Sequence, residues 1–147
     1  MTEDRQTGAP LAADPLTYLA AVLDAAQRDA EDATWHESAG TWIAYHREKY
    51  DGRWTIIDSL DDGVITTVDP QASDDKGVAA HVARHDPSSV LRRIAADRTT
   101  LALHRDVAGK CSECGQGYEA LEWGPDFPCQ TIRNLAEGWG WTQEEQQ

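Results

Sequence analysis

The feature that most constrains the fold of this chain is a set of three cysteines and one histidine in its last third. Cys111 and Cys114 form a Cys-x-x-Cys pair, Cys129 follows a Phe-Pro dipeptide, and six residues separate His104 from Cys111. Two thiolates in a tight turn supply half of a tetrahedral Zn²⁺ site, and two ligands from other elements complete it. Such an ion cross-links parts of a chain that a small core holds weakly. We therefore predict a structural zinc site with the ligands His104, Cys111, Cys114 and Cys129.

Two other interpretations of the cysteines fit the spacing less well. A redox Cys-x-x-Cys pair normally opens a helix within a βαβ unit, and no such unit is indicated here. Three buried free thiols would leave the spacing of Cys111 and Cys114 unexplained. Because no secretory signal precedes the first predicted helix, we expect a cytoplasmic protein, and in a reducing compartment cysteines serve as metal ligands rather than as disulfide partners.

His81 and His85 are the rival pair of metal ligands. They stand four residues apart in a predicted helix, which places them on one face. No glutamate follows His81, as a metalloprotease helix would require, and a four-ligand zinc site leaves no open position for water or substrate. Histidines at helical spacing are more often polar interfacial residues or helix ends, and we favour that interpretation.

The charge of the chain bears on its partners. It has 26 acidic and 13 basic residues among 147, for a formal net charge of −13. A field of this sign repels polyanions, so we expect no direct binding of nucleic acid. The acidity has two interpretations: it keeps the protein soluble, which we favour, or it imitates nucleic acid on a basic partner. No apolar run approaches the roughly 20 residues that a membrane-spanning helix needs, so we expect no membrane association.

Hydrophobic spacing predicts an α+β fold. Residues 1–13 are polar and small and form a flexible lead-in, and Asp14-Pro15 caps a helix over residues 15–32. Two Asp-Gly pairs separate three β-rich runs near residues 41–46, 53–58 and 64–68, which predicts an antiparallel meander with Trp42, Trp54 and Ile56 on its buried face.

The second half of the chain returns to helical spacing. A linker at residues 70–75 leads to a short helix over about 76–85 and then to a longer one, capped by Asp86-Pro87, that ends near His104. The Cys-x-x-Cys turn and a final short helix beginning near Cys129 follow. We expect one zinc-stabilised domain over residues 14–141 and a polar tail over residues 142–147.

Sequence signatures of catalysis are missing. The chain has no Gly-x-Ser-x-Gly elbow, no phosphate-binding glycine loop and no dinucleotide fingerprint. Carboxylates are abundant, but no spacing among them indicates acid–base chemistry. The sequence therefore favours a protein that is not an enzyme.

Several motifs together resemble a known family. They are the run His81-Val-Ala-Arg-His85-Asp86-Pro87, the Leu-Ala-Leu-His104 segment, the Cys-x-x-Cys pair and the Phe-Pro-Cys129 element. In combination they are similar to a family of short uncharacterised proteins of actinobacteria and their phages, a domain of unknown function. The resemblance covers roughly residues 15–136 and implies no activity. It implies a phage or mobile-element origin. The chain departs from the family pattern at residues 33–42 and again after Ala136, where a shared partner surface would be affected.

The leading functional hypothesis is a small zinc-stabilised accessory protein that binds another macromolecule, a protein partner. Its acidic surface and the C-terminal Trp139 and Trp141 would make the contacts, since exposed tryptophans often anchor interfaces. The alternative for the two tryptophans is that they cover the Cys-x-x-Cys turn. The first alternative is an acidic nucleic-acid mimic or inhibitor of a host nucleic-acid enzyme. The second is a metal-dependent enzyme that uses His81, His85 and Asp86 around another metal. The sequence does not indicate an oligomeric state.

Overall fold

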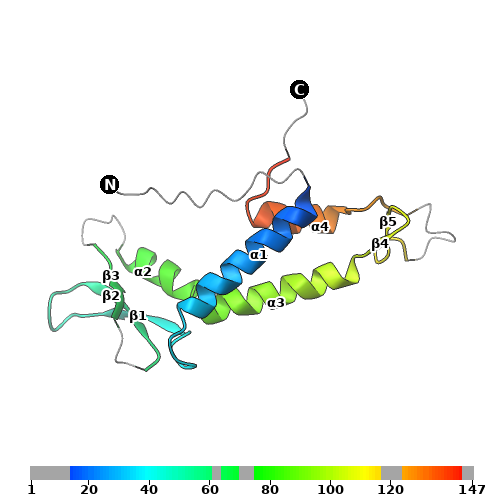
Figure 1. Cartoon of the computed structure of the whole chain (residues 1–147). Helices are drawn as coiled ribbons and strands as arrows, with labels where there is room; N and C mark the ends of the chain where they lie inside the picture. Colours follow the sequence, from blue (N-terminus) through cyan, green and yellow to red (C-terminus); the bar gives the residue numbers. More distant parts are fainter. Residues whose placement is uncertain (1–13, 61–63, 70–74, 117–123, 144–147) are drawn as a thin grey trace, which may run out of the picture. The chain divides into compact units, whose positions relative to one another are not determined.

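A computed structural model describes residues 14–60, 64–69, 75–116 and 124–143 of the chain. The helices of this part are α1 (Pro15–Asp32), α2 (Asp75–Arg84), α3 (Pro87–Leu103) and α4 (Gln130–Gly138). Its strands are β1 (Trp42–His46), β2 (Trp54–Asp58), β3 (Val64–Thr67), β4 (Asp106–Val107) and β5 (Lys110–Cys111). Figure 1 shows the elements in chain order. The predicted α+β class, with an N-terminal helix, a three-stranded meander, two consecutive helices and a final short helix, is confirmed.

Cα packing divides the chain into two compact units. The sheet unit spans Ala26–Ile94, and the cysteine unit combines the chain up to Ala25 with the chain from Ala95 onward. The boundary between the units falls inside α1 and again inside α3, so each of these helices contributes to both. The single domain expected over residues 14–141 stays a prediction, and residues 1–13 lie outside the described part of the chain.

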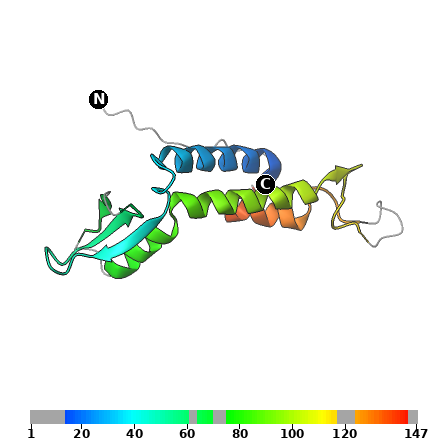
Figure 2. The ribbon, with the colours of Figure 1, turned by 90° about the horizontal axis from the view of Figure 1, so that it is seen from below.

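The sheet unit is built on an antiparallel meander of order β1-β2-β3. Trp42 pairs with Asp58 and Ala44 with Ile56, while a bulge shifts the register between β2 and β3 at Ile56 and Ile57. Alternate side chains point to one face, where Ile56 is fully buried and contacts Ala79 of α2. Figure 2 shows α2 lying along the sheet. Trp42 and Trp54 pack against this core and are half-buried, so the predicted inward face is correct.

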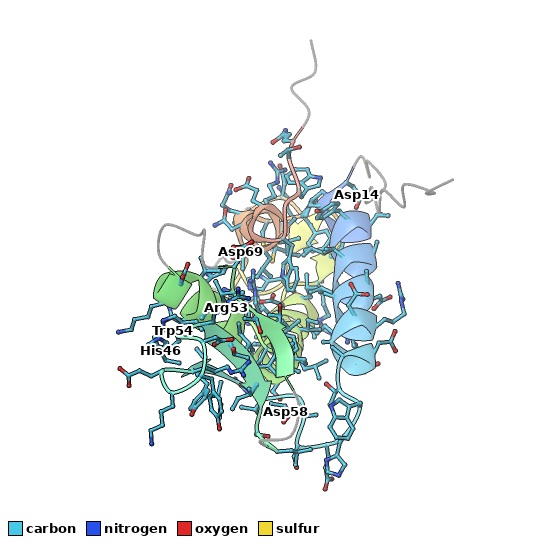
Figure 3. All side chains as sticks on the ribbon, turned by 90° about the vertical axis from the view of Figure 1, so that its left-hand side faces the viewer. Asp14, His46, Arg53, Trp54, Asp58 and Asp69 are labelled. Carbon is cyan, nitrogen blue, oxygen red and sulfur yellow. The ribbon has the colours of Figure 1, made fainter. Side chains whose placement is uncertain are left out.

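The β1–β2 connection is longer than a two-residue hairpin turn. It spans seven residues, from Arg47 to Arg53, closed by a hydrogen bond from the Arg47 N–H to the Arg53 carbonyl at 2.9 Å. Gly52 has φ of 67°, the left-handed conformation for which the Asp-Gly pair was a signal. His46 stacks on Trp54 with ring centroids 4.9 Å apart, and Figure 3 shows the two labelled side chains together. The second Asp-Gly pair, at residues 62 and 63, lies outside the described residues.

Asp86 joins α3 to the sheet. Its Oδ1 accepts a hydrogen bond from the Ser89 N–H at 2.7 Å, which is N-cap geometry, and its Oδ2 accepts one from the Trp42 N–H at 3.1 Å. The side chain is 6% exposed. The predicted cap at Asp86-Pro87 is therefore confirmed, and the carboxylate also holds the first residue of β1. Asp75, which was expected in the linker, instead begins α2.

Asp14 caps α1 as predicted. Its Oδ1 accepts from the Thr17 N–H at 2.9 Å, and its Oδ2 accepts from the Thr17 hydroxyl at 2.6 Å. The hydroxyl of Thr17, followed by its N–H, lowers the pKa of the Asp14 carboxyl. Unlike Asp86, this capping carboxylate is exposed to solvent.

The cysteine unit packs the first half of α1, the second half of α3 and α4 around one apolar core. Its buried members are Leu19, Cys111, Cys129, Ile132, Ala136 and Trp141. Among the described residues, no helix has both the length and the apolar character that crossing a membrane requires.

The C-terminal tryptophans belong to this core. Trp141 is 8% exposed, whereas Trp139 is half-buried and donates its indole N–H to Asp97 at 2.7 Å. The Tyr18 hydroxyl donates to the Trp139 carbonyl at 2.9 Å, and Gly140, with φ of 103°, turns the chain back toward the core. The expectation that Trp139 and Trp141 are exposed contact residues is therefore wrong. Burial of their large apolar rings against α4 outweighs exposure.

Candidate metal centre

Three separate segments bring the predicted ligands together. His104 directly follows α3, and its N–H still donates to the Thr100 carbonyl at 3.2 Å, so the helix fixes its position. Cys111 is the last residue of β5, and Cys114 lies in the turn that follows. Cys129 occupies the N-cap position of α4. His104, Cys111 and Cys129 thus sit at the ends of regular elements, and Cys114 lies in the turn after β5.

The β4–β5 hairpin reverses the chain between His104 and Cys111. Its two central residues, Ala108 and Gly109, have φ of 53° and 81°, as a two-residue turn with the twist of the strands requires. The Gly109 N–H donates to the Asp106 carboxylate at 2.7 Å. This turn explains how only six residues suffice to bring Cys111 back beside His104.

Ser112 ties the cysteine turn to the end of α3. Its hydroxyl donates to the Leu103 carbonyl at 3.1 Å and accepts from the Arg105 N–H at 3.1 Å, and its own N–H donates to the Arg105 carbonyl at 2.9 Å. Within the turn, the Gly115 N–H donates to the Cys111 carbonyl at 2.9 Å. No sequence pattern singles out Ser112, because a serine between two cysteines can equally be a solvated residue.

The segment before α4 is fastened to the same hairpin. The Phe127 N–H donates to the Gly109 carbonyl at 2.9 Å, and the Cys111 N–H donates to the Pro125 carbonyl at 3.0 Å. Lys110 forms an ion pair with Asp126 at 2.5 Å, and its ammonium lowers the pKa of the Asp126 carboxyl. A cis peptide bond joins Phe127 to Pro128 immediately before Cys129.

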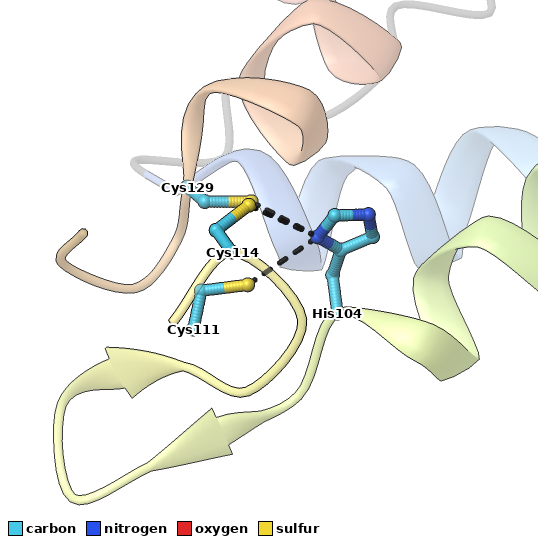
Figure 4. A group of neighbouring side chains, drawn as sticks. All are labelled: His104, Cys111, Cys114 and Cys129. Carbon is cyan, nitrogen blue, oxygen red and sulfur yellow. Dashed lines mark hydrogen bonds between the residues drawn. The ribbon is translucent and has the colours of Figure 1, made fainter. Parts of the chain in front are cut away.

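The four side chains converge on one point (Figure 4). The sulfurs of Cys111, Cys129 and Cys114 lie 3.3, 3.4 and 3.6 Å from the Nδ1 atom of His104. All four donor atoms lie within 4.8 Å of one another. In a tetrahedral zinc site with Zn–S of about 2.3 Å and Zn–N of about 2.0 Å, nitrogen and sulfur are about 3.6 Å apart. The arrangement therefore fits a metal ion bound through Nδ1 and three sulfurs.

The donors are sheltered from solvent. Cys111 is fully buried and Cys129 is 3% exposed, while His104 and Cys114 are half-buried. Leu101 and Phe127 pack against this core, and the buried Ile132 and Trp141 belong to it. Such a shell keeps water away from the sulfurs and leaves the histidine and one cysteine at the margin.

The thiols influence one another strongly. Burial, together with hydrogen bonds from Cys111 and Cys129, raises the pKa of Cys114 to about 11. Burial acts to raise the pKa of Cys129 as well, but the N–H of Ile132 at the start of α4 and the neighbouring thiols outweigh it and leave that pKa lowered. Burial thus opposes ionisation of the Cys114 thiol, whereas the start of α4 favours the thiolate form of Cys129.

The rival histidines are not part of this centre. His81 and His85 lie on α2 in the sheet unit, and both are exposed to solvent. Asp86, the third residue of the enzyme alternative, uses both carboxylate oxygens to accept backbone N–H groups. Within residues 14–60, 64–69, 75–116 and 124–143, the His104 cluster is the only group of three or more metal-binding side chains.

The fold and this cluster define an α+β protein with a three-cysteine, one-histidine centre suited to a metal ion. The chain belongs to a family of unknown function (DUF6221), whose model matches residues 12–140. Comparison with curated proteins and with solved structures gives no match. Membership in the family carries no activity with it, so a function must be argued from the residues themselves.

Proposed function

We propose that the protein is a zinc-stabilised accessory protein that binds a protein partner. The observation that carries the first part is the convergence of three cysteine sulfurs on Nδ1 of His104 at 3.3 to 3.6 Å. Three thiolates and an imidazole are a donor set typical of structural zinc, which is four-coordinate and closed. With His104, Cys111, Cys114 and Cys129 all bound, no position remains for substrate, so the ion holds the cysteine unit together.

The identity of the metal is tested by elemental analysis of the purified protein. We expect about one zinc per chain, because a tetrahedral site with three thiolates and one imidazole favours Zn²⁺ over the oxygen-seeking divalent ions. Replacement of the metal by Co²⁺ should give the intense visible absorption of tetrahedral thiolate coordination, which His104→Ala should alter. A protein that carries iron, or much less than one metal per chain under reducing conditions, would contradict the zinc assignment.

The partner surface belongs elsewhere, because the C-terminal tryptophans are packed inside the cysteine unit. Large apolar side chains that remain exposed in the sheet unit include Trp35, Ile43, Tyr45 and Tyr50, at 66%, 49%, 50% and 79% exposure. Ile43 and Tyr45 share the face of β1 opposite to Trp42 and Ala44, which contact the core. Exposed aromatic and apolar side chains of this size favour contact with another protein.

The partner hypothesis is tested on a purified complex once a candidate has been captured. Tyr45→Ser is expected to weaken binding at least about tenfold, since aromatic anchors commonly contribute about 2 kcal/mol or more. Leu103→Ser is the matched control, because Leu103 is also an exposed apolar residue, at 54%, but lies in the cysteine unit. Equal loss in both variants, or no loss in Tyr45→Ser, would contradict this surface.

The charge of −13 favours a second candidate, an acidic mimic of nucleic acid that occupies a basic surface of a host enzyme. The two candidates differ in salt dependence: binding through the mimic weakens steeply between about 50 and 200 mM salt, whereas binding through apolar anchors changes little. A phage or mobile-element origin is part of the same proposal and rests on the sequence resemblance. A cytoplasmic location is also part of it, because three cysteines that serve as metal ligands suit a reducing compartment.

A further inference from the structure

His81 and His85 form a second candidate metal site, separate from the cysteine centre. They are one helical turn apart on α2, and their ring centroids are 4.6 Å apart with the planes tilted by 54°. Both side chains are exposed. The helix packs its opposite side against the sheet through the buried Ala79 and the half-buried Val82. The two imidazoles therefore lie next to each other on a solvent-facing surface.

The spacing of the two rings permits chelation of one ion. An ion bound to a ring nitrogen at about 2.0–2.1 Å lies about 3.2 Å from the ring centroid. If the N–metal–N angle is about 90°, the centroids of the two imidazoles lie about 4.5 Å apart. If that angle is tetrahedral, the centroids lie about 5.2 Å apart. The observed 4.6 Å is close to the first value. Right-angled nitrogen coordination is characteristic of Ni²⁺ and Cu²⁺ rather than of structural Zn²⁺.

We propose that His81 and His85 chelate a divalent transition-metal ion of the Ni²⁺ or Cu²⁺ type, with water in the remaining positions. Asp86 adds no ligand, because its two oxygens accept the N–H groups of Trp42 and Ser89. The site differs from the cysteine centre in donor chemistry, in exposure and in the unit that carries it. It is open to exchange with solvent, whereas the cysteine centre is closed.

The probe is Ni²⁺, added to the full-length protein as purified, at about pH 8, where free imidazole is neutral. Paramagnetic broadening of backbone amide signals locates the ion without any assay of activity. We expect broadening centred on residues 81 and 85, and at least about tenfold weaker binding in both His81→Ala and His85→Ala, because each variant converts a two-point attachment into a single one. His36→Ala is the matched control, since His36 is exposed in the same unit but outside α2.

Three outcomes would overturn the proposal. The first is an absence of broadening up to about 1 mM Ni²⁺. A dissociation constant above about 1 mM corresponds to less than about 4 kcal/mol of binding free energy, which a single exposed imidazole could supply. The second is broadening that survives in either His81→Ala or His85→Ala, which would mean single-histidine binding. The third is broadening centred on His36 or on the cysteine centre, accompanied by loss of the metal that the protein carried when purified. Thermal unfolding of each variant confirms that the exposed substitutions leave the fold intact.

Discussion

Cys129→Ser is expected to destabilise the cysteine unit by more than about 3 kcal/mol. Cys129 lies at the start of α4 and directs its sulfur at His104 Nδ1, so its loss removes the ligand that fastens α4 to the hairpin. Loss of a group that only hydrogen-bonds to a metal ligand commonly weakens metal affinity by about 10–100-fold. Loss of the ligand itself should weaken the affinity further. Because the proposed zinc ion would bind only the folded state, the lost affinity should appear as lost stability. Amide hydrogen exchange across α4 and α2 measures the effect in each unit.

Chelation supplies the control for this variant. Removing a buried thiol also changes packing, so the free energy of unfolding is compared with and without a strong chelator. If the metal stabilises the fold, the chelator should lower the free energy of unfolding of the unsubstituted protein nearly to that of Cys129→Ser. The free energy of unfolding of the variant should change little. Exchange in α2, which belongs to the sheet unit, should stay the same. A protein whose unfolding is insensitive to chelator would contradict a structural role for the metal.

The cluster of one histidine and three cysteines could be predicted because its signal is chemical and local. A Cys-x-x-Cys pair fixes two donors within one turn, and Cys129 and His104 were the nearest donors at the ends of predicted helices. Helix limits were also predictable, because Asp14, Asp86 and their following prolines mark starts that tertiary packing does not alter. The prediction of α1 over residues 15–32 agrees with Pro15–Asp32.

Other features depend on contacts that no local pattern encodes. Trp139 and Trp141 stand next to a polar tail, and only the hydrogen bonds of Trp139 to Asp97 and Tyr18 reveal that the segment folds back. The bulge between Ile56 and Ile57 depends on how β2 pairs with β3, and no residue pattern within either strand encodes it. Ser112 acquires its role from Leu103 and Arg105, which the hairpin brings near. Contacts between separate segments decided each of these.

Asp86→Ala is expected to destabilise the sheet unit by about 2–4 kcal/mol. Loss of an N-cap acceptor typically costs about 1 kcal/mol, and a buried N–H left without a partner costs a further 1–3 kcal/mol, both approximate. Asp86 supplies both functions, since it accepts from Ser89 at the start of α3 and from Trp42 at the start of β1. Urea denaturation of the metal-loaded protein measures the loss, and hydrogen exchange should place it in β1 and the first turn of α3.

Asp14→Ala separates the two contributions. Asp14 caps α1 in the same way, through the Thr17 N–H, but it is exposed and its other oxygen accepts from the Thr17 hydroxyl. Its replacement should therefore cost only the capping contribution of about 1 kcal/mol. Asp86→Asn, which keeps one acceptor oxygen, should fall between the two alanine variants because one of its two backbone N–H groups loses its partner. Equal losses in Asp14→Ala and Asp86→Ala would mean that Asp86 is only a helix cap and that its bond to Trp42 adds nothing to the stability of the sheet.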